Sequence, residues 1–95
     1  MATPSLTDLR FLESAARTGS LSGAARELGV TQQAVSARLR ALERLIDVEL
    51  LRRSHSGIAL TPFGEVVLGE GREVLAASAR LDDAIASLRG PAAES

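Results

Sequence analysis

The chain has 95 residues, of which 45% are hydrophobic and only 2% aromatic, and it carries a formal net charge of −1 with no cysteine. This length suits one small domain plus an appendage, and a core built from Ala, Leu and Val suits packed helices better than a sheet sandwich. The absence of cysteine excludes a disulfide framework, a thiolate zinc site and a cysteine nucleophile.

The charges are distributed unevenly along the chain. Residues 31–56 contain five arginines and three acids, whereas residues 62–95 contain three arginines and six acids. The middle of the chain is therefore mildly basic and its last third acidic. Charged residues also interrupt the apolar runs near the N-terminus, so we predict no signal peptide, no membrane span and a cytoplasmic location.

Two helices are predicted in the first third of the chain. Apolar residues at helical spacing place the first over residues 6–17, ending before Gly19, and the second over about residues 22–28. Gly29 stops the second helix, because a left-handed turn residue is easiest for glycine. The candidate N-caps are Ser5 or Thr7 for the first helix and Ser20 or Ser22 for the second.

A third helix follows after a tight turn. Thr31 caps it, and it runs to about residue 46. Its expected inward residues are Val35, Leu39, Leu42, Leu45 and Ile46, the last three folding back onto the first helix. Two helices joined by so short a turn must cross steeply, which is the helix-turn-helix arrangement whose second helix can enter a DNA major groove.

A short hairpin is predicted next. Residues 50–54 and 58–60 are strand candidates on either side of His55-Ser56-Gly57, and Gly57 supplies the positive φ that a tight turn demands. An isolated hairpin is marginally stable, so Leu50 and Leu60 must pack on the helices. The hairpin would be the wing of a winged helix.

The last element is a helix about 40 Å long over residues 62–89, with Thr61 as N-cap and Pro62 at the first position. An apolar and small-residue seam with 3-4 spacing comprises Val67, Gly71, Val74, Ser78, Leu81, Ile85 and Leu88. A second stripe, Phe63, Val66 and Leu68, is expected to pack on the body. The seam then needs a partner, for which a second copy of the chain is favoured over a further domain.

The expected fold class is therefore mainly α. Residues 1–61 form a winged helix-turn-helix of three helices plus a two-stranded wing, and residues 62–89 form a long linker and dimerisation helix. Residues 90–95 are expected to be a flexible tail after Gly90 and Pro91.

Two stretches carry a family resemblance: FLESAARTGSLSGAARELGVTQQAVSARLRALE at residues 11–43 and ELLRRSHSGIALTPFG at residues 49–64. With the long helix that follows, the chain resembles the N-terminal DNA-binding region of LysR-type transcriptional regulators. The resemblance implies a linker helix that pairs antiparallel in a dimer, and binding to interrupted palindromic promoter sites. It also implies a C-terminal effector-binding domain that these residues do not contain, so a small-molecule effector would act only through that absent domain.

The resemblance places the family's groove-facing positions on Thr31, Gln32, Gln33 and Ser36. It also matches Arg40 to a commonly basic position and Arg53 to the arginine of the strand leading into the wing. The sequence departs from the family pattern at Gln33 (often Pro), Asp47 (often Gly), Leu51 (often Phe) and Ser56 (often Arg).

The residues themselves suggest a similar site. The face of the third helix opposite its apolar stripe presents Gln32, Gln33, Ser36, Ala37, Arg40 and Arg44. Glutamine can bond an adenine edge with two hydrogen bonds, and arginine neutralises phosphates. The expected phosphate ligands are Arg40, Arg44, Arg52, Arg53 and Ser54. Arg44 has an equal alternative as an ion-pair partner of Glu43, Asp47 or Glu49, and Arg38 is interpreted as a partner for an acid on the first helix.

Other functions find little support. His55 is the only histidine, so no catalytic dyad or histidine metal site can be assembled, and we predict no enzyme, cofactor or metal. Asp82-Asp83 is interpreted as a solvated face, and Gly69 and Gly71 lie in a helical pattern rather than a phosphate loop. The expected function is sequence-specific binding of double-stranded DNA by a homodimer in transcription regulation. The alternative is a winged-helix protein-interaction module, suggested by the near-neutral charge.

Overall fold

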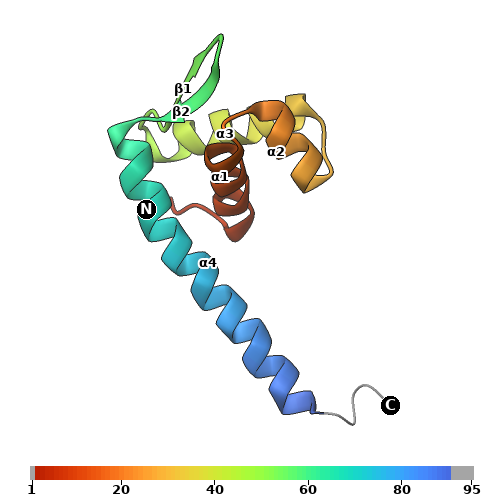
Figure 1. The fold of residues 1–95 in the computed structure, drawn as a ribbon. Helices are drawn as coiled ribbons and strands as arrows, with labels where there is room; N and C mark the ends of the chain where they lie inside the picture. The colour runs from red at the N-terminus through yellow and green to blue at the C-terminus, as the bar shows by residue number, and fades with distance from the viewer. Residues whose placement is uncertain (1, 91–95) are drawn as a thin grey trace.

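The computed structural model describes residues 2–90, which form four helices and a two-stranded antiparallel sheet (Figure 1). The elements are α1 (Leu6–Thr18), α2 (Leu21–Leu28), α3 (Gln32–Ile46), β1 (Leu51–Ser54), β2 (Gly57–Leu60) and α4 (Pro62–Arg89). The predicted mainly α fold, a winged helix-turn-helix followed by a long helix, is confirmed. The tail predicted for residues 90–95 lies, apart from Gly90, outside the described residues.

Hydroxyl side chains begin all four helices. Ser5, rather than Thr7, caps α1: its Oγ accepts from the Asp8 N–H at 3.1 Å, and the Asp8 carboxylate accepts from the Ser5 N–H at 2.9 Å. Ser20, rather than Ser22, caps α2 by accepting from the Gly23 N–H at 2.8 Å. The predicted caps Thr31 and Thr61 are confirmed. These bonds satisfy N–H groups that a helix leaves unpaired.

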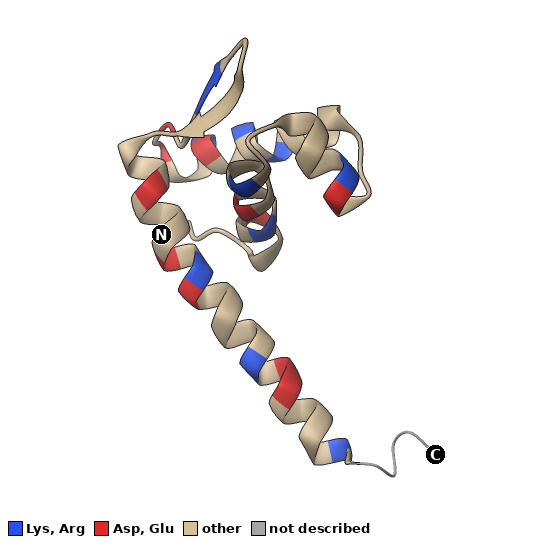
Figure 2. Ribbon diagram, viewed as in Figure 1, with Lys and Arg blue, Asp and Glu red and all other residues tan. Residues whose placement is uncertain are grey.

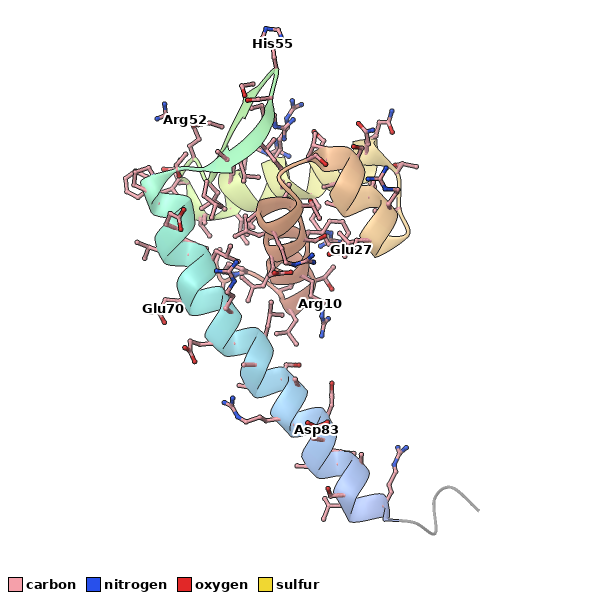
Figure 3. The ribbon with its side chains drawn as sticks, in the orientation of Figure 1. Arg10, Glu27, Arg52, His55, Glu70 and Asp83 are labelled. Atoms are coloured by element: carbon pink, nitrogen blue, oxygen red, sulfur yellow. The ribbon has the colours of Figure 1, made fainter. Side chains whose placement is uncertain are left out.

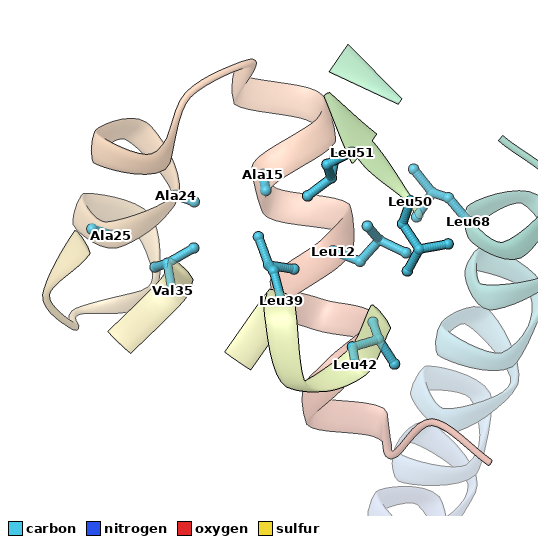
Figure 4. Close-up of a cluster of buried hydrophobic side chains, with 10 residues drawn as sticks. All are labelled: Leu12, Ala15, Ala24, Ala25, Val35, Leu39, Leu42, Leu50, Leu51 and Leu68. Atoms are coloured by element: carbon cyan, nitrogen blue, oxygen red, sulfur yellow. The ribbon is translucent and has the colours of Figure 1, made fainter. Parts of the chain in front are cut away.

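The core lies where α1 crosses the other helices (Figure 4). Leu12, Leu39, Leu42, Leu50 and Leu68 are each at most 1% exposed and come from α1, α3, α4 and the segment before β1. The prediction for Leu45 was wrong, because this side chain is 44% exposed. Three residues turn a helix by about 60° less than a full turn, which moves Leu45 away from the buried stripe of α3.

The wing contacts the segment between α1 and α2 through the start of β2. Residues pair from Leu51 with Leu60 to Ser54 with Gly57. The Ile58 N–H donates to the Gly19 carbonyl at 3.0 Å, and Gly57 has φ 123° and approaches Gly19 so closely that a Cβ would overlap its carbonyl oxygen. The predicted need for Gly57 is therefore confirmed, with a second reason in this close approach.

Only the first part of α4 packs on the body (Figure 1). Its inward face is Gly64, Leu68 and Gly71, which are all buried. The prediction that Phe63 and Val66 pack on the body was wrong, since they are 62% and 68% exposed. The helical period explains the difference: residues 64, 68 and 71 share one face, residue 63 lies about 100° around the helix from it, and residue 66 lies on nearly the opposite side.

The rest of α4 projects away from the winged helix (Figure 1). The radius of gyration is 15.5 Å and the principal extents are 51 × 30 × 17 Å. A compact chain of this length has a radius of gyration of about 13 Å. The projecting helix accounts for the excess, and it leaves Leu81, Ile85 and Leu88 exposed.

Asp47 ends α3 in the left-handed conformation, with φ 57° and ψ 41°, and is the only non-glycine residue with positive φ among residues 2–90. Its carboxylate also lies at a helix C-terminus, which disfavours negative charge. We expect Asp47→Gly to raise the free energy of unfolding by about 1 kcal/mol, because it relieves both effects. Thermal unfolding should show a Tm about 4–8 °C higher. Asp47→Asn, which removes only the charge, should give a smaller rise; a lower Tm for Asp47→Gly would contradict the account.

Candidate nucleic-acid interface

The start of α3 offers an exposed polar surface. Thr31, Gln32 and Gln33 are exposed and Ser36 is half-buried. Further along the helix, Val35, Leu39 and Leu42 are at most 1% exposed, which fixes the rotation of α3 about its axis. Thr31, Gln32 and Gln33 precede Val35, the first buried residue of α3, so these exposed side chains and half-buried Ser36 form one surface at the start of the helix.

The wing approaches this surface through one hydrogen bond. Arg53 on β1 donates from Nη1 to the Ser36 Oγ at 2.9 Å. Its neighbour Arg52 instead lies 3.5 Å from the Glu49 carboxylate, with three quarters of its side chain exposed. Successive strand residues point to opposite faces, so the two arginines have different surroundings. Figure 2 shows basic residues on both α3 and the wing.

The remaining predicted phosphate ligands are also exposed. Arg40 and Arg44 lie on the outer side of α3, and Ser54 lies near the wing tip with its Oγ 3.0 Å from the Ser56 Oγ. Within residues 2–90 neither Arg40 nor Arg44 forms an ion pair, so the alternative pairing of Arg44 with Asp47 or Glu49 is not observed. Their charges are available to an anionic ligand.

Arg38 joins α3 to α1. Its Nη1 donates to the Asp8 carboxylate at 3.0 Å, and its guanidinium carbon lies 5.0 Å from the centre of the Phe11 ring. The structural role predicted for Arg38 is confirmed. Burial raises the pKa of the Asp8 carboxyl, but hydrogen bonds from the Ser5 backbone and from Arg38 outweigh it and hold the pKa below its ordinary value. The ion pair therefore fixes α3 against α1.

The comparison with known families identifies the fold's relatives. The sequence model described as "Bacterial regulatory helix-turn-helix protein, lysR family" matches residues 6–65, which is more than half of the chain. The chain belongs to the lysR family. The family model ends just inside α4, so most of the long helix lies beyond the matched part.

Full-length relatives in the lysR family are much longer than this chain. An uncharacterized HTH-type transcriptional regulator of Mycobacterium tuberculosis is 45% identical over 86 residues, which cover 90% of this chain and 28% of that protein. The regulator CbbR of Rhodospirillum rubrum is 38% identical over 85 residues, with the same two coverages. The chain thus spans little more than a quarter of the length of these relatives.

Two solved DNA-binding domains with bound DNA share the fold of this lysR-family chain. The CbnR domain in its DNA complex has a TM-score of 0.82 and 32% identity, covering 90% of this chain and 98% of that one. The BenM domain on its benA site 1 DNA has a TM-score of 0.85 and covers 93% and 99%, but at 20% identity it supports the fold alone.

Two carboxylates of this lysR-family chain have structural roles that sequence reasoning missed. Glu43 on α3 accepts hydrogen bonds from the backbone N–H groups of Leu50 at 2.7 Å and Leu51 at 3.3 Å, which joins α3 to the wing. Glu27 on α2 accepts from Arg17 and, at 2.7 Å, from Ser14, and these bonds lower the pKa of Glu27. Charge spacing along one helix gives no signal for such contacts, because the partners lie on crossing elements.

The part of the chain that the structure describes contains little that points to other chemistry. Among residues 2–90, no group of three His, Cys, Asp or Glu side chains is placed to hold a metal ion. No described helix has the length and apolar content needed to cross a membrane. His55 projects alone at the tip of the wing, as expected for a solvated loop residue (Figure 3).

Proposed function

We propose that this chain is the sequence-specific DNA-binding region of a lysR-family transcriptional regulator, acting in the cytoplasm on double-stranded DNA. The observation that carries the proposal is the exposed polar start of α3, with Thr31, Gln32 and Gln33 uncovered and Arg53 beside Ser36. A helix presented in this way fits the width of the major groove. The DNA-bound CbnR domain, similar over nearly its whole length, supports the same role.

The side chains of this surface can contact both the base edges and the phosphates of DNA. Gln32 and Gln33 each offer an amide that can pair with adenine N6 and N7, and the Ser36 hydroxyl can bond a base edge. Arg40, Arg44, Arg52 and Arg53 would contact phosphates, which position the helix without distinguishing sequences. The net charge of −1 does not oppose this, because the long helix carries much of the negative charge away from the surface (Figure 2).

We propose that α4 pairs with α4 of a second copy, so that the dimer binds an interrupted palindrome. Val74, Leu81, Ile85 and Leu88 are 43–86% exposed on one side of the projecting helix. Phe63 lies on the same side, because 18 residues, the distance to Leu81, make five helical turns. An apolar groove of about 460 Å³ continues this surface beside the body, lined mainly by Pro4, Leu9, Ile46, Val48, Val66, Val67 and Val74.

The expected dimer interface needs one correction. Gly71 is buried inside its own chain, where a Cβ would lie 2.9 Å from the Leu9 Cδ2, and Val67 is half-buried against the core. The close approach expected from a second chain at Gly71 is thus made by α1. Among the predicted interface residues, Val74, Ser78, Leu81, Ile85 and Leu88 remain available. We place any small-molecule effector site outside these 95 residues.

Site selection from genomic fragments, followed by binding titrations, tests the proposal. Against the selected site, Gln32→Ala with Ser36→Ala should lose at least about 30-fold in affinity, since each of two good base contacts contributes about 1–3 kcal/mol of discrimination. Affinity for random duplex should change little. Ser87→Ala, an exposed hydroxyl on α4, is the matched control and should leave both affinities unchanged.

The alternative, a protein-interaction module, makes the opposite prediction for the same titrations. A DNA-binding domain should bind random duplex at low salt and lose that affinity steeply as salt rises, because phosphate contacts release counterions. Absence of binding at low salt would favour the interaction module. Equal affinity of the wild-type protein for selected and random duplex would overturn sequence-specific recognition.

A further inference from the structure

We propose that Arg53 is a positioning residue that makes Ser36 a hydrogen-bond donor toward the DNA, so that Ser36 selects a base with an acceptor group. This inference rests on the proposed function and adds a specificity mechanism to it. Arg53 lies on β1 and Ser36 on α3, and the bond between Arg53 Nη1 and Ser36 Oγ is 2.9 Å long. The wing thereby reaches the helix that would enter the major groove.

The bond constrains the serine chemically. A hydroxyl has one donor and two acceptor positions, whereas a guanidinium has only donors. The Arg53 N–H therefore takes an acceptor position of Ser36, and its positive charge polarises the O–H into a better donor and a poorer acceptor. Within residues 2–90 the Ser36 O–H donates to no other group, including the Gln32 carbonyl one turn earlier. The proton is available to the groove.

Base edges differ in what they can offer this proton. In the major groove, purine N7, guanine O6 and thymine O4 are acceptors, whereas cytosine presents only the N4 amino donor. A serine held as a donor discriminates against the base that offers only a donor at its position. A serine released from Arg53 can rotate its hydroxyl and accept as well as donate, so this discrimination weakens.

Arg53 keeps enough donors to contact a phosphate as well. Its guanidinium has five N–H groups, of which the Ser36 contact uses one. Among residues 2–90 no carboxylate pairs with Arg53, in contrast to Arg52 with its Glu49 partner. A purely phosphate-neutralising arginine would strengthen binding to all sequences equally. The proposed role predicts that Arg53 affects one base position more than the others.

Arg53 has two roles to separate, positioning Ser36 and neutralising a phosphate. The experiment is selection from duplexes randomised at every position of the site, with affinities measured at two salt concentrations. We expect Arg53→Ala to lower affinity and also to flatten the preference at one base pair by about tenfold. Arg53→Lys should restore the salt dependence but not that preference, since lysine lacks the planar fork. Ser36→Ala should flatten the same position, and Ser36→Ala added to Arg53→Lys should flatten it no further.

Arg52→Ala is the matched control, one residue away on the same strand. It should weaken binding to all sequences to a similar extent and leave the base preference intact, and circular dichroism should show that all variants fold. If Arg53→Ala and Arg52→Ala both reduced affinity uniformly, or if Arg53→Lys kept the full preference, the inference would be overturned while the proposed function stood. A wild-type protein without preference for any duplex would overturn both.

Discussion

Gly64→Ala is expected to lower the free energy of unfolding by about 3 kcal/mol or more, which is the upper range for overpacking a rigid site. A Cβ at Gly64 would overlap the Leu50 carbonyl oxygen and lie 3.0 Å from the Leu60 Cδ2. The carbonyl has little freedom to retreat, because it accepts from the Thr61 N–H at 2.9 Å. Urea unfolding monitored by circular dichroism measures the loss.

Gly69→Ala is the matched control for this prediction. Gly69 lies in the same helix and is exposed, with no atom within 4 Å of the position a Cβ would take. The substitution should therefore stabilise the protein by about 0.5–1 kcal/mol, because alanine loses less conformational freedom in a helix. Equal effects of the two substitutions would show that helix propensity, and not the contact with Leu50, decides the stability of this region.

Leu81→Glu with Ile85→Glu is expected to convert the protein to a monomer and to reduce affinity for an operator by at least about 100-fold. The two side chains are 60% and 43% exposed on the projecting part of α4, so the charges should be tolerated by the monomer but not at a paired apolar surface. Loss of the second DNA contact removes an avidity of about 10²–10⁴. Light scattering gives the oligomeric state, and fluorescence anisotropy gives the affinity.

Ala76→Glu adds the same charge to the opposite side of α4 and serves as the control. Ala76 is exposed, and its position in the helical period places it away from Leu81 and Phe63. This variant should remain dimeric and bind the operator normally. A double-glutamate variant that stayed dimeric would show that the two copies associate through another surface, such as the groove beside Val66.

Features set by a few neighbouring residues were predicted well from the sequence. Thr31 and Thr61 cap their helices, and Gly29 ends α2 with φ 70°, because each needs only the local conformation of the chain. The helical period also placed Val35 and Leu39 inside. These inferences use geometry that does not depend on the rest of the fold.

The buried face of α4 could not be predicted in the same way. Its residues 63–68 offer apolar side chains on several sides, and the side that becomes buried depends on where α1 lies. Leu9 of α1 packs on Gly71, so the buried face of α4 contains Gly64 and Gly71. Phe63 and Val66 are left exposed. The contacts of Glu43 and Glu27 were missed for a related reason, since each carboxylate bonds groups on a different element.

The junction at Thr61 determines how the two halves of a palindrome would be spaced. Thr61 donates its N–H to the Leu50 carbonyl at 2.9 Å and its hydroxyl to the Glu49 carbonyl at 2.6 Å, and its Oγ1 accepts from the Gly64 N–H at 3.0 Å. With three bonds at one residue, α4 behaves as a rigid arm fixed to the winged helix rather than as a tether. Each residue inserted in that arm would rotate one winged helix by about 100° relative to its partner. In the proposed dimer, the separation and phase of the half-sites would therefore depend on the length of α4, at a distance from the candidate base-contacting residues.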